Sequence, residues 1–129
     1  MPNGDEAQES LQGLRILLVE DDPLIRLDLE SSLSDLGAIV ISASDVAAAL
    51  EIVAAATLDF AVLDFELGVE TSEPIVSAAL EHKVPFLYLS GYSDNDQRFA
   101  RWPDAIILVK PISASAIARH IRRALSERR

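Results

Sequence analysis

The chain has 129 residues, half of them hydrophobic, and a formal net charge of −10 at pH 7. This length suits one domain with a real hydrophobic core, and the hydrophobic content excludes a chain that is disordered throughout. The negative charge argues against binding to DNA or RNA, whose phosphates would be repelled, and the absence of cysteine excludes disulfides and thiolate metal sites.

Residues 1–12 are polar and acidic, and we expect them to form a flexible tail before a single domain over residues 13–129. The tail has neither the basic start nor the apolar middle of a signal peptide. No stretch approaches the roughly 20 apolar residues that a membrane-spanning helix needs. We therefore expect a cytoplasmic protein that does not associate with a membrane.

The first predicted elements are a buried strand over residues 15–20 and a helix over residues 23–36. Asp22 suits the N-cap of this helix, and Pro23 suits its first helical position. Leucine and isoleucine then recur at helical spacing until Gly37, which ends the helix.

The same alternation of strand and helix continues to the end of the chain. Short apolar runs predict four more strands, over residues 38–43, 59–65, 84–90 and 105–109. Between and after them, helices are predicted over residues 46–56, 72–83, 93–102 and 113–129. Asp45 and Ser72 are expected to cap the first two of these helices, while the helix over 93–102 is polar and weak.

Five strands that alternate with five helices predict an α/β fold of the (βα)5 type, because continuous apolar strands indicate a parallel sheet covered on both faces. Right-handed crossovers leave few topologies, and the doubly wound, flavodoxin-like form has the strand order 2-1-3-4-5. Ligands of this fold bind where the winding reverses, at the carboxyl ends of strands 1 and 3.

Polar residues follow the strands at this same edge of the sheet. Glu20 and Asp21 end strand 1, Asp64 ends strand 3, Ser90 ends strand 4 and Lys110 ends strand 5. Two carboxylates about 5 Å apart repel by roughly 3 kcal/mol at an effective dielectric constant near 20, and one lysine cannot offset three acids. A divalent cation can, and oxygen ligands suit Mg²⁺. These are the groups needed to transfer a phosphoryl group to an aspartate.

Four short motifs resemble, in order and spacing, those of the receiver domain of two-component response regulators. They are LLVEDDP, AVLDFEL, LYLSGY and LVKP. The resemblance implies that Asp64 is the phosphoacceptor, that Ser90 bonds a phosphoryl oxygen and that Lys110 pairs with the phosphoryl charge. It also implies a cis peptide bond before Pro111. For the metal it implies an acidic pair and further ligands, which are Glu20, Asp21, Asp64 and the backbone carbonyl of Glu66.

The motif PFLYLSGY is similar to that of the alphaproteobacterial single-domain receivers nicknamed FAT GUY, which are linked with phosphorelays and general stress signalling. Pro85, Phe86, Gly91 and Tyr92 match that motif, and Tyr88, Leu89 and Ser90 depart from it. The broad family has an aromatic residue in strand 5 where this chain has Ile107. We therefore expect Tyr92 to take over the coupling between Ser90 and the helix over 93–102.

No output domain is expected, because the chain ends with the last predicted helix. The resemblance implies that a sensor histidine kinase or phosphotransfer protein supplies the phosphoryl group and that a downstream partner protein receives the signal. One alternative is a magnesium-dependent phosphohydrolase that forms an aspartyl-phosphate, with Glu66 as its second acid. Another is a pseudo-receiver, a binding module that is never phosphorylated.

Overall fold

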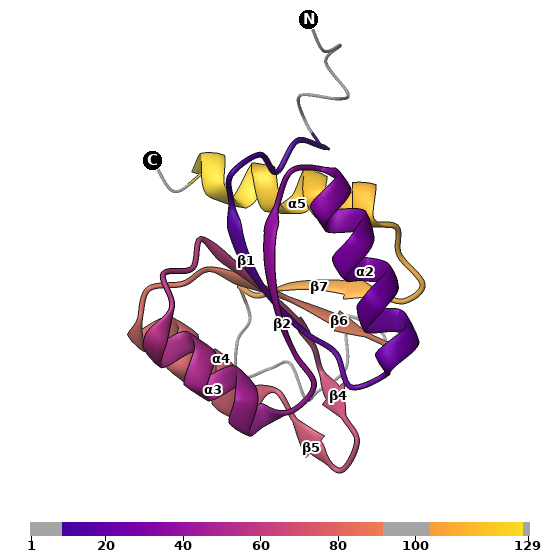
Figure 1. Cartoon of the computed structure of the whole chain (residues 1–129). Helices are drawn as coiled ribbons and strands as arrows, with labels where there is room; N and C mark the ends of the chain where they lie inside the picture. Colours follow the sequence, from indigo (N-terminus) through magenta and orange to yellow (C-terminus); the bar gives the residue numbers. More distant parts are fainter. Residues whose placement is uncertain (1–8, 92–103, 128–129) are drawn as a thin grey trace, which may run out of the picture.

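A computed structural model describes residues 9–91 and 104–127, in which five strands form a parallel sheet (Figure 1). The sheet strands are β1 (Arg15–Val19), β2 (Ile39–Ala43), β3 (Phe60–Asp64), β6 (Phe86–Ser90) and β7 (Ile106–Val109). The described helices are α2 (Pro23–Asp35), α3 (Val46–Ala55), α4 (Glu73–Glu81) and α5 (Ala114–Glu127). The predicted helix over 93–102 and Tyr92 lie outside the described residues.

The strand order is β2-β1-β3-β6-β7, and every neighbouring pair in this sheet is parallel. Counted along the sheet-forming strands, this is the predicted order 2-1-3-4-5. The prediction of a doubly wound parallel sheet is therefore confirmed. Figure 1 shows α2 and α5 on one face of the sheet and α3 and α4 on the other.

Two separate hydrophobic clusters cover the two faces of the sheet. Alternate residues of β1 divide between them: Leu17 and Val19 belong to the cluster under α3 and α4, and Ile16 and Leu18 to the cluster under α2 and α5. All four side chains are fully buried. A strand buried on both faces must be apolar at every position, which explains the unbroken run ILLV before the acids.

The predicted caps of α2 and α3 are confirmed. Asp22 Oδ1 accepts hydrogen bonds from the backbone nitrogens of Leu24 and Ile25, at 2.9 and 3.2 Å. Asp45 caps α3 by accepting a hydrogen bond of 2.8 Å from the backbone of Ala48. These carboxylates satisfy amide groups that have no partner within a first helical turn.

Ser72 occupies the N-cap position of α4, but the prediction that its side chain caps the helix is wrong. Its Oγ is buried and makes no hydrogen bond within the described residues. Its backbone is used instead: the Ser72 amide donates to the Phe65 carbonyl at 3.2 Å, and its own carbonyl accepts from Ile75 and Val76. The residue thus joins α4 to the end of β3 through the main chain.

The segment after β3, for which no strand or helix is predicted, is not a plain loop. It forms a hairpin of two short strands, β4 (Glu66–Leu67) and β5 (Glu70–Thr71), which pair antiparallel. Gly68 has a φ of +67°, a conformation that glycine adopts at little cost in a two-residue hairpin turn. Leu67 is buried against the core, whereas Val69 is fully exposed at the tip of the hairpin.

Candidate functional site

The carboxyl ends of four sheet strands bring the predicted site residues to one edge of the sheet. Val19 pairs with Leu63, so Glu20 and Asp64 follow at the same level of neighbouring strands. On the other side of β3, β6 ends at Ser90, and the amide of Lys110 donates to the Ser90 carbonyl at 2.8 Å. The peptide bond between Lys110 and Pro111 is cis, as the resemblance implied.

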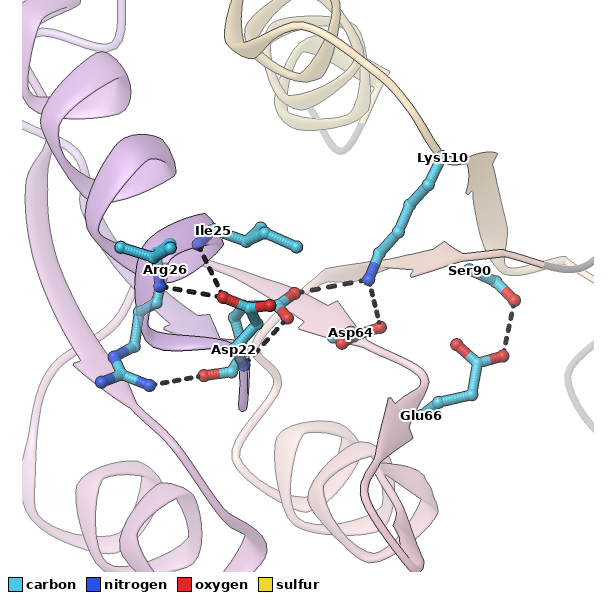
Figure 2. Close-up of polar contacts among 9 residues, drawn as sticks. Asp22, Ile25, Arg26, Asp64, Glu66, Ser90 and Lys110 are labelled. Carbon is cyan, nitrogen blue, oxygen red and sulfur yellow. Dashed lines mark hydrogen bonds and ion pairs between the residues drawn. The ribbon is translucent and has the colours of Figure 1, made fainter.

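Three carboxylates and one ammonium form the centre of this site. Figure 2 shows the Lys110 ammonium next to Asp64. One oxygen each of Glu20, Asp21 and Asp64 lie within 4.8 Å of one another. Lys110 Nζ lies 2.9 Å from Asp64 Oδ1 and 3.5 Å from Glu20 Oε2. Glu20 and Asp64 are almost completely buried, at 1 % and 2 % exposed, whereas Asp21 is open to solvent. The site therefore has two inner carboxylates and one at its mouth.

Burial and charge perturb the two groups that form the central ion pair. Burial raises the pKa of Asp64 to about 7, and the charge of Glu20 acts in the same direction, although contact with Lys110 opposes it. Burial alone would lower the pKa of Lys110. The contact with Asp64 and the charges of Asp64 and Glu20 outweigh burial and raise that pKa above its usual value. The ammonium therefore stays charged beside the acids.

Glu20 is held in place by two further contacts. Its Oε1 accepts a hydrogen bond of 3.2 Å from the backbone of Asp22, and its carbonyl accepts one of 2.9 Å from Arg26 Nη1. Arg26 belongs to the first turn of α2, and its role was not predicted from the sequence. The position of this arginine in the sequence was informative, because a cation is unfavourable near the positive end of a helix unless an acid is close. Asp22, the third acid of the run, caps the helix instead.

Ser90 and Glu66 form a second pair beside the central ion pair. The buried Ser90 hydroxyl donates to Glu66 Oε1 at 2.9 Å. Figure 2 shows the Glu66 side chain directed toward Ser90, on the far side of Asp64 from Asp22. From the sequence, Glu66 is expected to act only through its backbone carbonyl, or as the second acid of a phosphohydrolase. The contact of its side chain with Ser90 was not predicted.

The donor set suits a hard divalent cation. All three clustered groups are carboxylates, and Mg²⁺ prefers oxygen ligands. Asp64 Oδ1 is buried and receives no hydrogen bond within the described residues, because Lys110 meets it as an ion pair outside hydrogen-bond geometry. A buried carboxylate oxygen with unused acceptor capacity, next to two more carboxylates, fits a metal ligand.

An apolar cavity of about 360 Å³ lies beside Lys110, between α2 and the segment that leads into α5. Its lining includes Leu24, Ile25, Leu29, Pro111 and Ile112. Leu24 is 78 % exposed, although leucines are usually buried when a helix packs on a sheet. The site therefore opens next to an exposed apolar surface.

The comparisons with known proteins agree on one family. The sequence profile of the response regulator receiver domain matches residues 16–122. A response regulator receiver protein from Sinorhizobium medicae WSM419 is 30 % identical, with a TM-score of 0.81 over 93 % of this chain and 100 % of that one. The activated, BeF3-bound SdrG from Pseudomonas melonis Fr1 is 35 % identical, with a TM-score of 0.70 over 86 % and 95 %.

A more distant structure shares the fold. It is the receiver domain of a sensor histidine kinase from Pseudomonas aeruginosa PAO1, in which a magnesium ion is coordinated in the active site cleft. It is 23 % identical, with a TM-score of 0.76 over 88 % of this chain and 98 % of that chain. No curated protein sequence gave a match. Within the described ranges, no helix has the length and apolar character to cross a bilayer.

Proposed function

Because the chain belongs to the response regulator receiver family, we propose that it is a receiver that accepts a phosphoryl group on Asp64. The family makes it a phosphorylatable signalling domain rather than an ordinary enzyme. One observation carries the assignment to Asp64. Its buried carboxylate lies close both to the acids that follow β1 and to the ammonium of Lys110, which is 2.9 Å away. No other described aspartate has both neighbours.

The proposed reaction is transfer from a phosphohistidine of a sensor kinase or phosphotransfer protein. A carboxylate oxygen of Asp64 forms a bond to phosphorus while the phosphorus–nitrogen bond of the donor breaks, and its electron pair returns to the imidazole. Lys110 is already beside the attacking carboxylate and would pair with the charge of the transferred group. Little covalent chemistry is left to the protein, so positioning and charge stabilisation carry the step.

We propose that Asp21, Asp64 and the backbone carbonyl of Glu66 hold Mg²⁺, with Glu20 completing the acidic pair. When bound, the cation would neutralise the clustered carboxylates and stabilise charge on the phosphoryl oxygens. Arg26 fixes the backbone of Glu20 by a hydrogen bond of 2.9 Å, so it supports the pair from outside the site. The magnesium-bound kinase receiver supports this assignment as a fold relative.

The exposed apolar surface around the cavity supports a docking role for the phosphodonor. Leu24 and Ile25 of α2 border the same cavity as Lys110, so a helix of the donor that covers them would bring its phosphohistidine close to Asp64. We propose that a downstream partner protein then reads the phosphorylated state, and that neither DNA nor a membrane takes part. The net charge of −10 supports the exclusion of DNA.

Finer parts of the proposal rest on the sequence motifs. The expected boundary of the tail at residue 12 needs a correction, because Leu11 is fully buried and its amide donates to the Leu36 carbonyl at 2.8 Å. We propose that the receiver already includes Leu11, that it is cytoplasmic and that it belongs to the FAT GUY subclass. Pro85, Phe86 and Gly91 carry the subclass assignment, and a place in a phosphorelay follows from it.

Phosphorylation by acetyl phosphate tests the central proposal. The protein is incubated with acetyl phosphate and Mg²⁺, and the modified residue is mapped by mass spectrometry. We expect an acid-labile phosphate on Asp64, its loss in Asp64→Asn and its retention in Asp35→Asn, a matched change at the exposed end of α2. Undiminished labelling of Asp64→Asn would refute the assignment, and labelling that does not need Mg²⁺ would refute the role of the metal.

A further inference from the structure

The hydrogen bond between Ser90 and Glu66 follows from how their strands are joined. Asp64 pairs with Leu89, and the amide of Phe65 donates to the Leu89 carbonyl at 2.9 Å. Ser90 directly follows Leu89, and Glu66 directly follows Phe65, so the Glu66 side chain comes within hydrogen-bond distance of the Ser90 hydroxyl. The hairpin turns the chain back after Leu67, which is buried, so Glu66 is held at the start of a short strand.

Ser90 cannot serve two acceptors at once. A serine hydroxyl carries one proton and can donate one strong hydrogen bond. In this structure the proton is directed to Glu66 Oε1 at 2.9 Å. In the proposed phosphorylated state, the same hydroxyl donates to a phosphoryl oxygen on Asp64. The hydrogen bond from Ser90 to the Glu66 carboxylate must therefore break before Ser90 can donate to the phosphoryl group.

We infer that the Glu66 carboxylate is a latch that holds Ser90 in the unphosphorylated arrangement. Glu66 is thus a positioning residue, which acts on the phosphoryl group through Ser90 and sets the balance between the two states. This inference rests on the proposed function of Asp64 and adds a residue to it. Hydrogen bonds to an ionised acceptor are about twice as strong as neutral ones, so the latch competes directly with the phosphoryl group for the hydroxyl.

The latch makes a quantitative demand on binding of a phosphoryl analogue. A phosphoryl analogue binds to the arrangement in which Ser90 is released from Glu66. If the arrangement with the Ser90–Glu66 hydrogen bond is favoured by some factor, the affinity for the analogue is lower by the same factor. The net contribution of a hydrogen bond to a charged group is about 1.5–3 kcal/mol, and the lower end of that range corresponds to roughly tenfold in affinity. Removal of the Glu66 carboxylate should therefore tighten binding of the analogue about tenfold.

Beryllofluoride at fixed Mg²⁺ is the probe, titrated by calorimetry into the wild type and into Glu66→Ala, Glu66→Gln and Glu70→Ala. Glu70 lies in the same hairpin and is exposed, so Glu70→Ala removes an equal charge without touching Ser90. Each change is then repeated with Ser90→Ala. This double-mutant cycle separates the latch from a general loss of negative charge, because only the latch acts through the hydroxyl.

We expect Glu66→Ala to bind beryllofluoride about tenfold more tightly than the wild type, Glu66→Gln to bind with intermediate affinity and Glu70→Ala to match the wild type. With Ser90→Ala, the gain from Glu66→Ala should vanish. A gain that persists with Ser90→Ala, or unchanged affinity in both Glu66 variants, would overturn the latch and leave the role of Asp64 intact. Absence of beryllofluoride binding in the wild type would overturn both proposals.

Discussion

Replacement of Lys110 by methionine tests how far the site depends on one cation. Methionine keeps most of the length and apolar stem of lysine but removes the ammonium, which lies 2.9 Å from Asp64 Oδ1 and 3.5 Å from Glu20 Oε2. At an effective dielectric constant near 20, these two distances correspond to attractions of about 6 and about 5 kcal/mol. The variant leaves two buried carboxylates facing each other without the ammonium.

Several effects reduce the loss of stability below this sum. The desolvation of the charged groups offsets much of the attraction, and removal of one partner of a buried ion pair costs roughly 3–5 kcal/mol in measured cases. The Lys110 side chain is 27 % exposed, so water screens part of its charge. We expect a loss near the lower limit, about 3 kcal/mol, which corresponds to a melting temperature lower by roughly 10 °C for a domain of this size.

Thermal unfolding in EDTA and in millimolar Mg²⁺ provides the assay, with Arg122→Met as the control at an exposed basic residue. In EDTA, only Lys110→Met should melt clearly below the wild type. In Mg²⁺ the difference in melting temperature between Lys110→Met and the wild type should be smaller, because a bound cation then neutralises the carboxylates. A variant that melts together with the wild type in EDTA, or a gap that widens in Mg²⁺, would refute this account of the site.

Asp21→Asn should weaken Mg²⁺ binding at least tenfold by calorimetry, because it removes a charged ligand; equal affinity in Asp21→Asn and in the exposed control Asp35→Asn would contradict this. Arg26→Gln should also weaken Mg²⁺ binding, by less than Asp21→Asn, since it only loosens the backbone of Glu20; a larger loss would mean that Arg26 acts directly. Burial and the charges of two α5 arginines lower the pKa of His120, so the unfolded chain binds a proton more readily and stability from this group falls as the pH drops through about 6.5. As the pH is lowered from neutral to acidic, the free energy of unfolding measured in urea should therefore fall less in His120→Gln than in the wild type. If it falls equally in both proteins, His120 does not contribute.

The sequence predicted the fold and the central site for one physical reason. Parallel strands that are buried on both faces must be continuous apolar runs, and their carboxyl ends all point to one edge. The first polar residue after each run could therefore be assigned to that edge. Glu20, Asp64 and Lys110 were found in this way, and their distances agree with the expected cluster. The acids could be assigned to the site because each of them stands at the end of a predicted strand.

The parts that the sequence did not reveal depend on contacts between distant residues or on very short elements. Strands β4 and β5 have two residues each, too few for alternation to indicate a strand, and only Gly68 hinted at a turn. The bond between Ser90 and Glu66 joins residues 24 positions apart, and no local pattern encodes it. Ser72 had the residue type of a cap, but its buried Oγ makes no hydrogen bond within the described residues, and only its backbone bonds are formed.

The hairpin after β3 also makes the chain convenient for spectroscopy. Val69 is fully exposed at its tip, and a Cβ placed on the neighbouring Gly68 would lie 3.9 Å from Asp21 Oδ2. The natural sequence contains no cysteine, so Val69→Cys would introduce a unique thiol for a fluorophore or spin label. Such a label would sit at the free end of the strand pair that begins with Glu66, outside the core, and could report events at the carboxylates without burial of the dye.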